Sequence, residues 1–263
     1  MGDAPLDLFA SAVPYYARYR SGYPQAELDA LARRAGLDGS QRIIDVGCGT
    51  GQLAIPLARH ARTVVAIDPV ADMLAAGRRA ARAACVDNIT WLQGDSRQLA
   101  ELVEPGALVA SFAASFHWTD RRTVARVLDG LLAPGGSIVV INDDLGDSEA
   151  PDWVHAIAAI RSRYLGVDPA GADAHISPTR SHRDVLGDSP FSSIDRSTWS
   201  WTRQLNLEEV VGLQFSYSFS TPALFADRAE AFVAEVREAV LGLHPSGLVT
   251  EPFRVEVLLA TRP

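Results

Sequence analysis

Short runs of apolar, often β-branched residues alternate with stretches of helical periodicity along the first half of the chain. The alternation predicts a parallel sheet with helices on both faces, because right-handed strand–helix–strand crossovers leave few other topologies. Ligands of such sheets bind at the carboxyl ends of the strands. The predicted strands are 42–46, 63–67, 89–92, 107–112 and 137–141, separated by helices that include 52–60, 71–84 and 121–132.

The alternation stops after residue 142. A Gly-, Pro-, Asp- and Ser-rich segment covers 166–189, and regular structure is predicted again at 193–201, 207–213, 222–243 and 253–261. We predict one domain over residues 1–263, with a cofactor-binding core at about 38–142 and a cap formed by 1–37 and about 143–220.

Composition excludes several classes of function. The 24 basic and 32 acidic residues give a net charge of -8, which is the wrong sign for broad contact with a phosphate backbone. Two cysteines are too few for a disulfide framework or a four-ligand zinc site, and we predict no metal. The acidic N-terminus does not read as a signal peptide, and no uncharged apolar run reaches the roughly 18 residues of a membrane span. We therefore predict a cytoplasmic protein without nucleic-acid or membrane partners.

A glycine-rich turn follows the first predicted strand. It runs from Asp45 through Gly47, Gly49 and Gly51 directly into an apolar helix. Glycines here let a ligand approach the backbone closely. A dinucleotide fingerprint needs its third glycine at the position of Gln52, so a pyrophosphate is not the favoured ligand. A carboxylate beside the turn suits the ammonium group of an amino-acid moiety, which S-adenosylmethionine presents.

Two further acids follow the next two predicted strands. Asp68 lies where a carboxylate can accept hydrogen bonds from both ribose hydroxyls of an adenosine ligand. Asp95 is placed to accept from an adenine amino group, but it has the alternative role of a loop residue or helix cap.

With these motifs the chain resembles the class I S-adenosylmethionine-dependent methyltransferases, in particular the branch that includes trans-aconitate methyltransferase. The resemblance covers residues from about 16 to 141. It rests on the three-glycine turn and the three acids, and on motifs at 19–24, 116–120 and 133–136.

The resemblance implies a Rossmann-like α/β fold, with a seven-stranded, mostly parallel sheet, helices on both faces and a small helical cap. It implies S-adenosylmethionine as cofactor and S-adenosylhomocysteine as product. The predicted cofactor-binding residues are Arg20, Asp45, Gly47, Gly49, Gly51, Asp68, Met73, Asp95 and Ser96.

Two segments are candidates for contacts to the reacting groups. His117 follows the fourth strand and is the candidate catalytic residue, either as a general base or as a wall of the acceptor pocket. Near the N-terminus, Arg20 stands among several tyrosines and is predicted to pair with the methionine carboxylate. The alternative for the tyrosines is a hydrophobic flap.

We predict methyl transfer to an oxygen, nitrogen or carbon of a small-molecule substrate, by a monomer or homodimer. An NAD-dependent oxidoreductase is one alternative. The other is a methyltransferase-like protein that binds the cofactor without transferring the methyl group.

Overall fold

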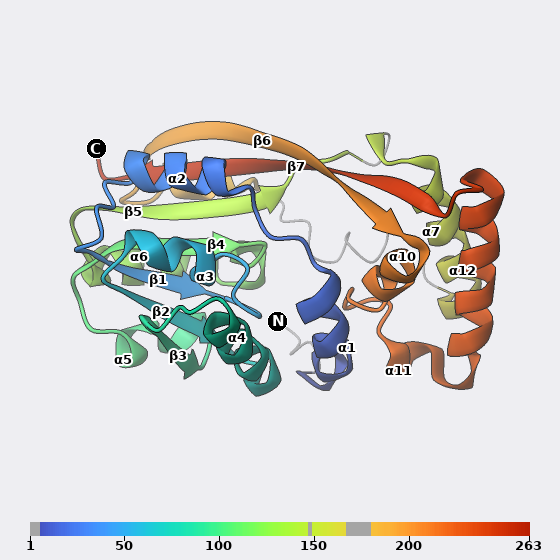
Figure 1. Cartoon of the computed structure of the whole chain (residues 1–263). Helices are drawn as coiled ribbons and strands as arrows, with labels where there is room; N and C mark the ends of the chain where they lie inside the picture. Colours follow the sequence, from blue (N-terminus) through green and yellow to red (C-terminus); the bar gives the residue numbers. More distant parts are fainter. Residues whose placement is uncertain (1–5, 147–148, 167–179) are drawn as a thin grey trace. The chain divides into compact units, whose positions relative to one another are not determined.

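The computed structural model describes residues 6–146, 149–166 and 180–263 (Figure 1). The chain divides into two compact units. Unit 1 contains Met1–Arg20, Leu145–Ser177 and Ser200–Arg254, and unit 2 contains Ser21–Asp144, Pro178–Trp199 and Val255–Pro263. Parts of the predicted cap, at 1–5, 147–148 and 167–179, lie outside the described residues. Of the rest, 21–37 falls in unit 2, and unit 1 extends past the predicted limit of 220.

The chain forms a seven-stranded sheet with the order β3-β2-β1-β4-β5-β7-β6, of which β1 to β5, the start of β6 and the end of β7 belong to unit 2. β1 to β5 pair in parallel, and β7 pairs antiparallel to β5. The strands are β1 (Arg42–Val46), β2 (Thr63–Asp68), β3 (Ile89–Gln93), β4 (Ala107–Ala113), β5 (Leu132–Asp143), β6 (Ser193–Asn206) and β7 (Leu248–Thr261). This confirms the predicted seven-stranded, mostly parallel sheet.

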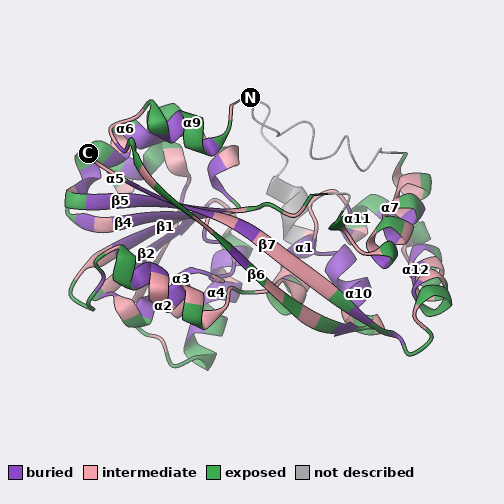
Figure 2. Cartoon of the chain, turned by 90° about the horizontal axis from the view of Figure 1, so that it is seen from above, coloured by how far each residue is buried: buried purple, intermediate pink, exposed green. Residues whose placement is uncertain are grey.

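Helices cover both faces of this sheet (Figure 2). One face carries α2 (Gln25–Arg34), α3 (Ala54–Leu57) and α4 (Ala71–Ala83), and the other carries α6 (Arg121–Leu131) and α9 (His182–Gly187). The central strands β1 and β4 are buried almost throughout, as expected for parallel strands between two helical layers. Their apolar side chains therefore form the core that supports the loops at the carboxyl ends of the strands.

The motif at 133–136 lies inside β5 rather than before it. Ala107 pairs with Leu132, whereas Val109 pairs with Ser137, so the residues between them bulge out of the ladder. Gly135 has a φ of +76° in this bulge, a conformation that glycine adopts without strain.

Unit 1 packs its helices around an aromatic core. Its helices are α1 (Leu6–Tyr19), α7 (Asp152–Leu165), α10 (Leu207–Gln214), α11 (Pro222–Phe225) and α12 (Ala229–Leu243). The rings of Phe225 and Phe232 stack with centroids 4.2 Å apart, and Phe215 packs on both. Tyr15, Tyr16 and Tyr19 lie within α1, and the ring of Tyr15 packs on that of Phe215 with centroids 5.2 Å apart. Pro14 lies inside α1, where proline disfavours a helix, and the packing of Tyr15 helps to stabilise the helix there.

Candidate active site

The glycine-rich turn joins β1 to α3 with all three glycines in the left-handed region. Gly47, Gly49 and Gly51 have φ values of +69°, +54° and +87°. A Cβ atom on Gly47 would lie 2.5 Å from the Cβ of Ser115, and one on Gly51 would lie 2.8 Å from the Trp91 ring. Besides any approach by a ligand, the glycines at 47 and 51 are therefore required by backbone conformation and by close packing within the chain.

Asp45 is a buried carboxyl group at the start of the turn. It is 1% exposed, and its Oδ1 accepts a hydrogen bond of 2.7 Å from the Ser111 hydroxyl on β4. Its Oδ2 is buried and has no hydrogen-bond partner among the described residues. Burial raises the pKa of Asp45 to about 7 and the nearby Asp68 adds to the rise, whereas the Ser111 hydrogen bond and, as the smallest effect, the backbone amide of Ala54 oppose it. Asp45 thus presents an unused acceptor that would gain from a cationic hydrogen-bond donor.

Asp68 ends β2 and closes the turn. Its Oδ2 accepts from the Gly49 amide at 2.8 Å, and its Oδ1 accepts from the Val70 amide at 2.9 Å. The side chain is buried, and burial raises its pKa while the two amides oppose the rise. Each carboxylate oxygen can accept a second hydrogen bond, so Asp68 keeps capacity for the hydroxyl groups of a ligand.

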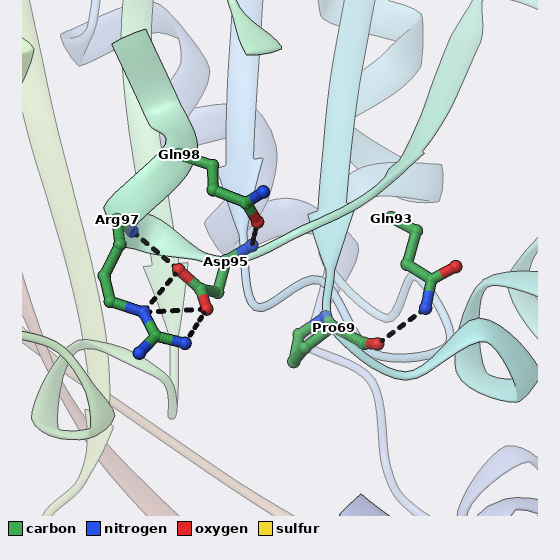
Figure 3. A network of polar contacts seen from close by, with 5 residues as sticks. All are labelled: Pro69, Gln93, Asp95, Arg97 and Gln98. Carbon is green, nitrogen blue, oxygen red and sulfur yellow. Dashed lines mark hydrogen bonds and ion pairs between the residues drawn. The ribbon is translucent and has the colours of Figure 1, made fainter. Parts of the chain in front are cut away.

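Asp95 follows β3 and caps a short helix, η2 (Ser96–Gln98) (Figure 3). Its carboxylate accepts from the Arg97 amide at 2.8 Å, and the Gln98 side chain accepts from the Asp95 amide at 3.2 Å. The Arg97 guanidinium also pairs with the carboxylate and is the main cause that lowers the pKa of Asp95. The cap considered from the sequence is present, and Arg97 occupies the oxygens that an adenine amino group would need.

The remaining predicted cofactor residues of unit 2 lie in η2, which follows β3, and in α4, which follows β2. Ser96 is the first residue of η2 and is partly exposed, whereas Met73 is buried in α4. Cys48 is buried between the glycines, and burial followed by Asp45 and Asp68 raises the pKa of its thiol well above the ordinary value. A thiol held protonated in this way is a packing group and not a nucleophile.

His117 lies in η3 (Phe116–Trp118), the short helix that follows β4. Its ring is 5.4 Å from the ring of Trp118, whose side chain is 44% exposed. On the other side it stacks on His182 of α9, with centroids 6.3 Å apart and an interplanar angle of 24°. His117 is partly exposed and therefore accessible at the strand end where the sequence predicted it.

Arg20 follows α1 and belongs to unit 1. Its guanidinium lies over the rings of Tyr217, at 4.2 Å, and Tyr16, at 5.3 Å. The Nε atom is buried and has no hydrogen-bond partner in the described part of the chain. Its pairing with the methionine carboxylate stays a prediction.

Several residues that shape the site were not identified from the sequence. Ser111 orients Asp45, Ser115 donates to the Val46 carbonyl at 2.6 Å, and His182 packs on His117. The two serines could have been identified from the sequence, because a hydroxyl group within or next to a buried strand needs a hydrogen-bond partner. His182 had none, because it lies far along the chain from the loop that it contacts.

Neither a metal cluster nor a membrane-spanning helix is present in the described residues. No group of three or more His, Cys, Asp or Glu residues there is arranged to hold a metal ion. No helix in the same residues is both long and apolar enough to cross a bilayer.

Sequence comparison finds relatives of this chain among known proteins. Residues 43–136 match the methyltransferase domain family. An uncharacterised methyltransferase of Mycobacterium tuberculosis is 28% identical over 240 residues, covering 90% of this chain and 87% of the relative. A ubiquinone biosynthesis O-methyltransferase of Xylella fastidiosa is 27% identical over 191 residues, covering 72% of this chain and 70% of the relative.

A solved structure shares the fold along nearly the whole chain. The S-adenosylmethionine-dependent methyltransferase of Geobacter sulfurreducens, in complex with S-adenosylhomocysteine, has a TM-score of 0.53 at 15% identity and covers 98% of each chain. The domain match and the methyltransferase relatives favour methyl transfer over the NAD-dependent alternative. The matched domain and the relatives therefore support a class I S-adenosylmethionine-dependent methyltransferase, the family indicated by the glycine-rich turn and the strand-end acids.

Proposed function

We propose that the protein transfers the methyl group of S-adenosylmethionine to a small-molecule acceptor, with the cofactor held at the carboxyl ends of β1, β2 and β3. The observation that carries the proposal is the buried Oδ2 of Asp45, which lacks a partner among the described residues. A buried carboxylate without its full set of hydrogen bonds is costly, and the ammonium group of the methionine moiety would relieve that cost. The donor set of the site thus fits the cofactor.

The proposed contacts divide the cofactor among the strand ends. Asp45 binds the ammonium group, and Asp68 uses its remaining acceptor capacity for the ribose hydroxyls. Asp95 accepts from the adenine amino group after Arg97 has moved away, and Ser96 lies beside it. Met73 contributes apolar contact, and the three glycines allow the backbone of the turn to lie beside the ligand without a side chain between them.

When bound, S-adenosylmethionine would supply a methyl group carried by a positively charged sulfur. After transfer, that sulfur is the neutral thioether sulfur of the product, S-adenosylhomocysteine. The protein then has to align the acceptor and exclude water. His117 and Trp118 are the residues proposed to contact the acceptor. An acceptor that must lose a proton would give it to His117, whereas a carboxylate acceptor is already ionised and needs no base.

The acceptor is proposed to be an oxygen, nitrogen or carbon atom of a small, amphipathic metabolite. The exposed indole of Trp118 next to the imidazole of His117 offers apolar and polar contact side by side. The relative named as an O-methyltransferase supports oxygen as the acceptor atom. Membership of the trans-aconitate branch, a cytoplasmic location, a monomeric or homodimeric state and the absence of nucleic-acid partners stay predictions from the sequence.

Calorimetry and isotope transfer test the proposal. The protein is titrated with S-adenosylmethionine and, separately, with NAD. It is then incubated with S-adenosylmethionine carrying a deuterated methyl group and with a small-molecule extract, and mass spectrometry follows labelled products and S-adenosylhomocysteine. We expect binding of S-adenosylmethionine alone, and a labelled product absent from a parallel reaction with Asp68→Asn. Binding without any labelled product would favour the non-transferring alternative.

A further inference from the structure

His182 is a buried histidine on α9 that packs against both the candidate catalytic loop and the arginine that begins α6. It is 7% exposed. Its ring lies 5.4 Å from the ring of Phe116 and 6.3 Å from that of His117. The Ser181 hydroxyl caps α9 by accepting from the Asp184 amide at 3.0 Å, which holds the start of the helix in place. His182 is thus a rigid neighbour of His117.

Arg121 determines which ring nitrogen of His182 carries the proton. The Arg121 Nη1 atom lies 3.2 Å from His182 Nδ1 and also donates to the Arg180 carbonyl at 2.8 Å. A guanidinium can only donate hydrogen bonds, so Nδ1 is the acceptor and the proton of the neutral ring is on Nε2. Since Arg121 binds both this ring and the backbone that leads into α9, the ring is held in one orientation.

The surroundings keep His182 uncharged. Burial, then Arg121, then His117 lower its pKa to about 4. Arg121 faces it from α6 and His117 from η3. The carboxylates of its own helix and cap are engaged elsewhere, since Asp184 accepts from Ser181 at 2.7 Å and Asp188 pairs with Arg180 at 2.7 Å. The ring that stacks on His117 is therefore a neutral imidazole.

We propose that His182, with its tautomer set by Arg121, is a positioning residue that holds the His117 ring in the orientation in which it meets the acceptor. The proposal rests on the proposed function, in which the acceptor contacts His117. A stacked neutral ring restricts the rotation of its neighbour without repelling a positive charge on it. Small losses of such alignment reduce the rate of a displacement reaction more than they reduce binding.

Two variants remove the hydrogen bond between Arg121 and His182 and keep an aromatic ring beside His117. His182→Phe keeps an aromatic ring beside His117 but cannot accept from Arg121. Arg121→Met keeps His182 but removes the donor. His60→Phe is the control, because His60 is another histidine of unit 2 whose ring nitrogen has a polar partner, Asp29 at 2.8 Å, and which is half-buried.

The first measurement needs no acceptor. NMR of the whole protein with labelled histidine follows the tautomer of His182 and the ring signals of His117 between pH 5 and pH 8. We expect the Nε2–H tautomer of His182 and no titration of this residue above pH 5. Arg121→Met is expected to mix the tautomers and shift the His117 signals, whereas His60→Phe leaves both unchanged. An Nδ1–H tautomer in the parent protein, or His117 signals unaffected by either variant, would overturn the proposal.

The second measurement uses the acceptor identified by isotope transfer. Arg121→Met and His182→Phe both keep a ring beside His117 but lose the hydrogen bond that orients it, so each is expected to lower kcat by about tenfold with little change in KM. Unchanged kcat in Arg121→Met, with the tautomer altered, would contradict a positioning role. Failure of the parent protein to methylate any acceptor would refute the proposed function instead, and the NMR result would still decide the histidine pair.

Discussion

The Ser111 hydroxyl donates a hydrogen bond of 2.7 Å to one oxygen of Asp45, while the other oxygen is buried without a partner in the described residues. Asp45 and Ser111 stand opposite each other in the β1–β4 register, so the sheet itself builds this pair. The arrangement leaves one oxygen of a buried carboxyl group for the proposed contact with the ammonium group of the cofactor.

Asp45→Asn is expected to stabilise the unliganded protein at pH 8. The pKa of Asp45 is raised from 3.8 to about 7, so between these values the folded protein binds a proton that the unfolded chain has lost. The contribution of this group to stability therefore falls as the pH rises from about 4 to about 7. Asn has no such dependence, and its buried amide group, which lacks an acceptor at the position of Oδ2, offsets about 1–3 kcal/mol of the gain. Thermal unfolding should show a variant that melts several degrees higher at pH 8, roughly 2–4 °C per kcal/mol, with a smaller difference at pH 5. A parent protein that melts higher at pH 8 would contradict this.

The same substitution is expected to weaken binding of S-adenosylhomocysteine by about tenfold or more, because a charged acceptor for the ammonium group is lost. In the parent protein the affinity should rise as the pH rises toward 7, when Asp45 ionises. 5′-Methylthioadenosine shares the adenosine but lacks the ammonium group, so its calorimetric affinity should be unchanged in the variant. Equal losses for both ligands would remove Asp45 from the ammonium site.

Asp68→Asn is expected to weaken the binding of both S-adenosylhomocysteine and 5′-methylthioadenosine, because both contain the ribose. The Asn amide would also face the backbone amide of either Gly49 or Val70, so some loss of stability is expected, of about 1–3 kcal/mol for a buried unpaired donor. Asp68→Ala would remove the acceptor of both backbone hydrogen bonds, so it too is expected to lower stability. Calorimetry and urea unfolding together separate the two effects. Normal affinity for both ligands would exclude a ribose contact.

Gly51→Ala and Gly130→Ala are expected to change stability in opposite directions. A Cβ at Gly51 would lie 2.8 Å from Trp91, and its φ is +87°, so the substitution should cost about 1–3 kcal/mol. Gly130 is in α6, where an added Cβ would meet no atom within 4 Å, and Ala should gain about 0.5–1 kcal/mol of helix propensity. Urea midpoints of the two variants measure this. A neutral Gly51→Ala would show that the turn can relax away from Trp91.

His117→Gln is expected to keep a near-parental kcat. Gln can donate and accept hydrogen bonds but cannot take up a proton in this pH range, so it preserves the role of a pocket wall and removes that of a base. His117→Ala should then raise KM and leave the pH profile of kcat intact. A loss of about 100-fold in kcat for Gln, with the acidic limb of the profile gone, would identify His117 as the base.

The sequence by itself determined the sheet, the turn and the acids. Alternating apolar runs and helical stretches predicted a parallel sheet, because parallel strands need helical crossovers, and the three acids could be placed at strand ends because each lies at or just after the end of an apolar run. The family followed from the same residues. These features can be recognised from patterns of residues close in sequence.

Only the tertiary structure decided which partners these residues have. The hydrogen bond from Ser111 to Asp45, the packing of Trp91 against Gly51 and the stacking of His182 on His117 join residues far apart along the chain. The helical state of the tyrosines of α1 likewise depends on Phe215, which lies near the other end of the sequence. Burial and long-range contact set the pKa of Asp45 and the tautomer of His182, and neither quantity is encoded in a local pattern.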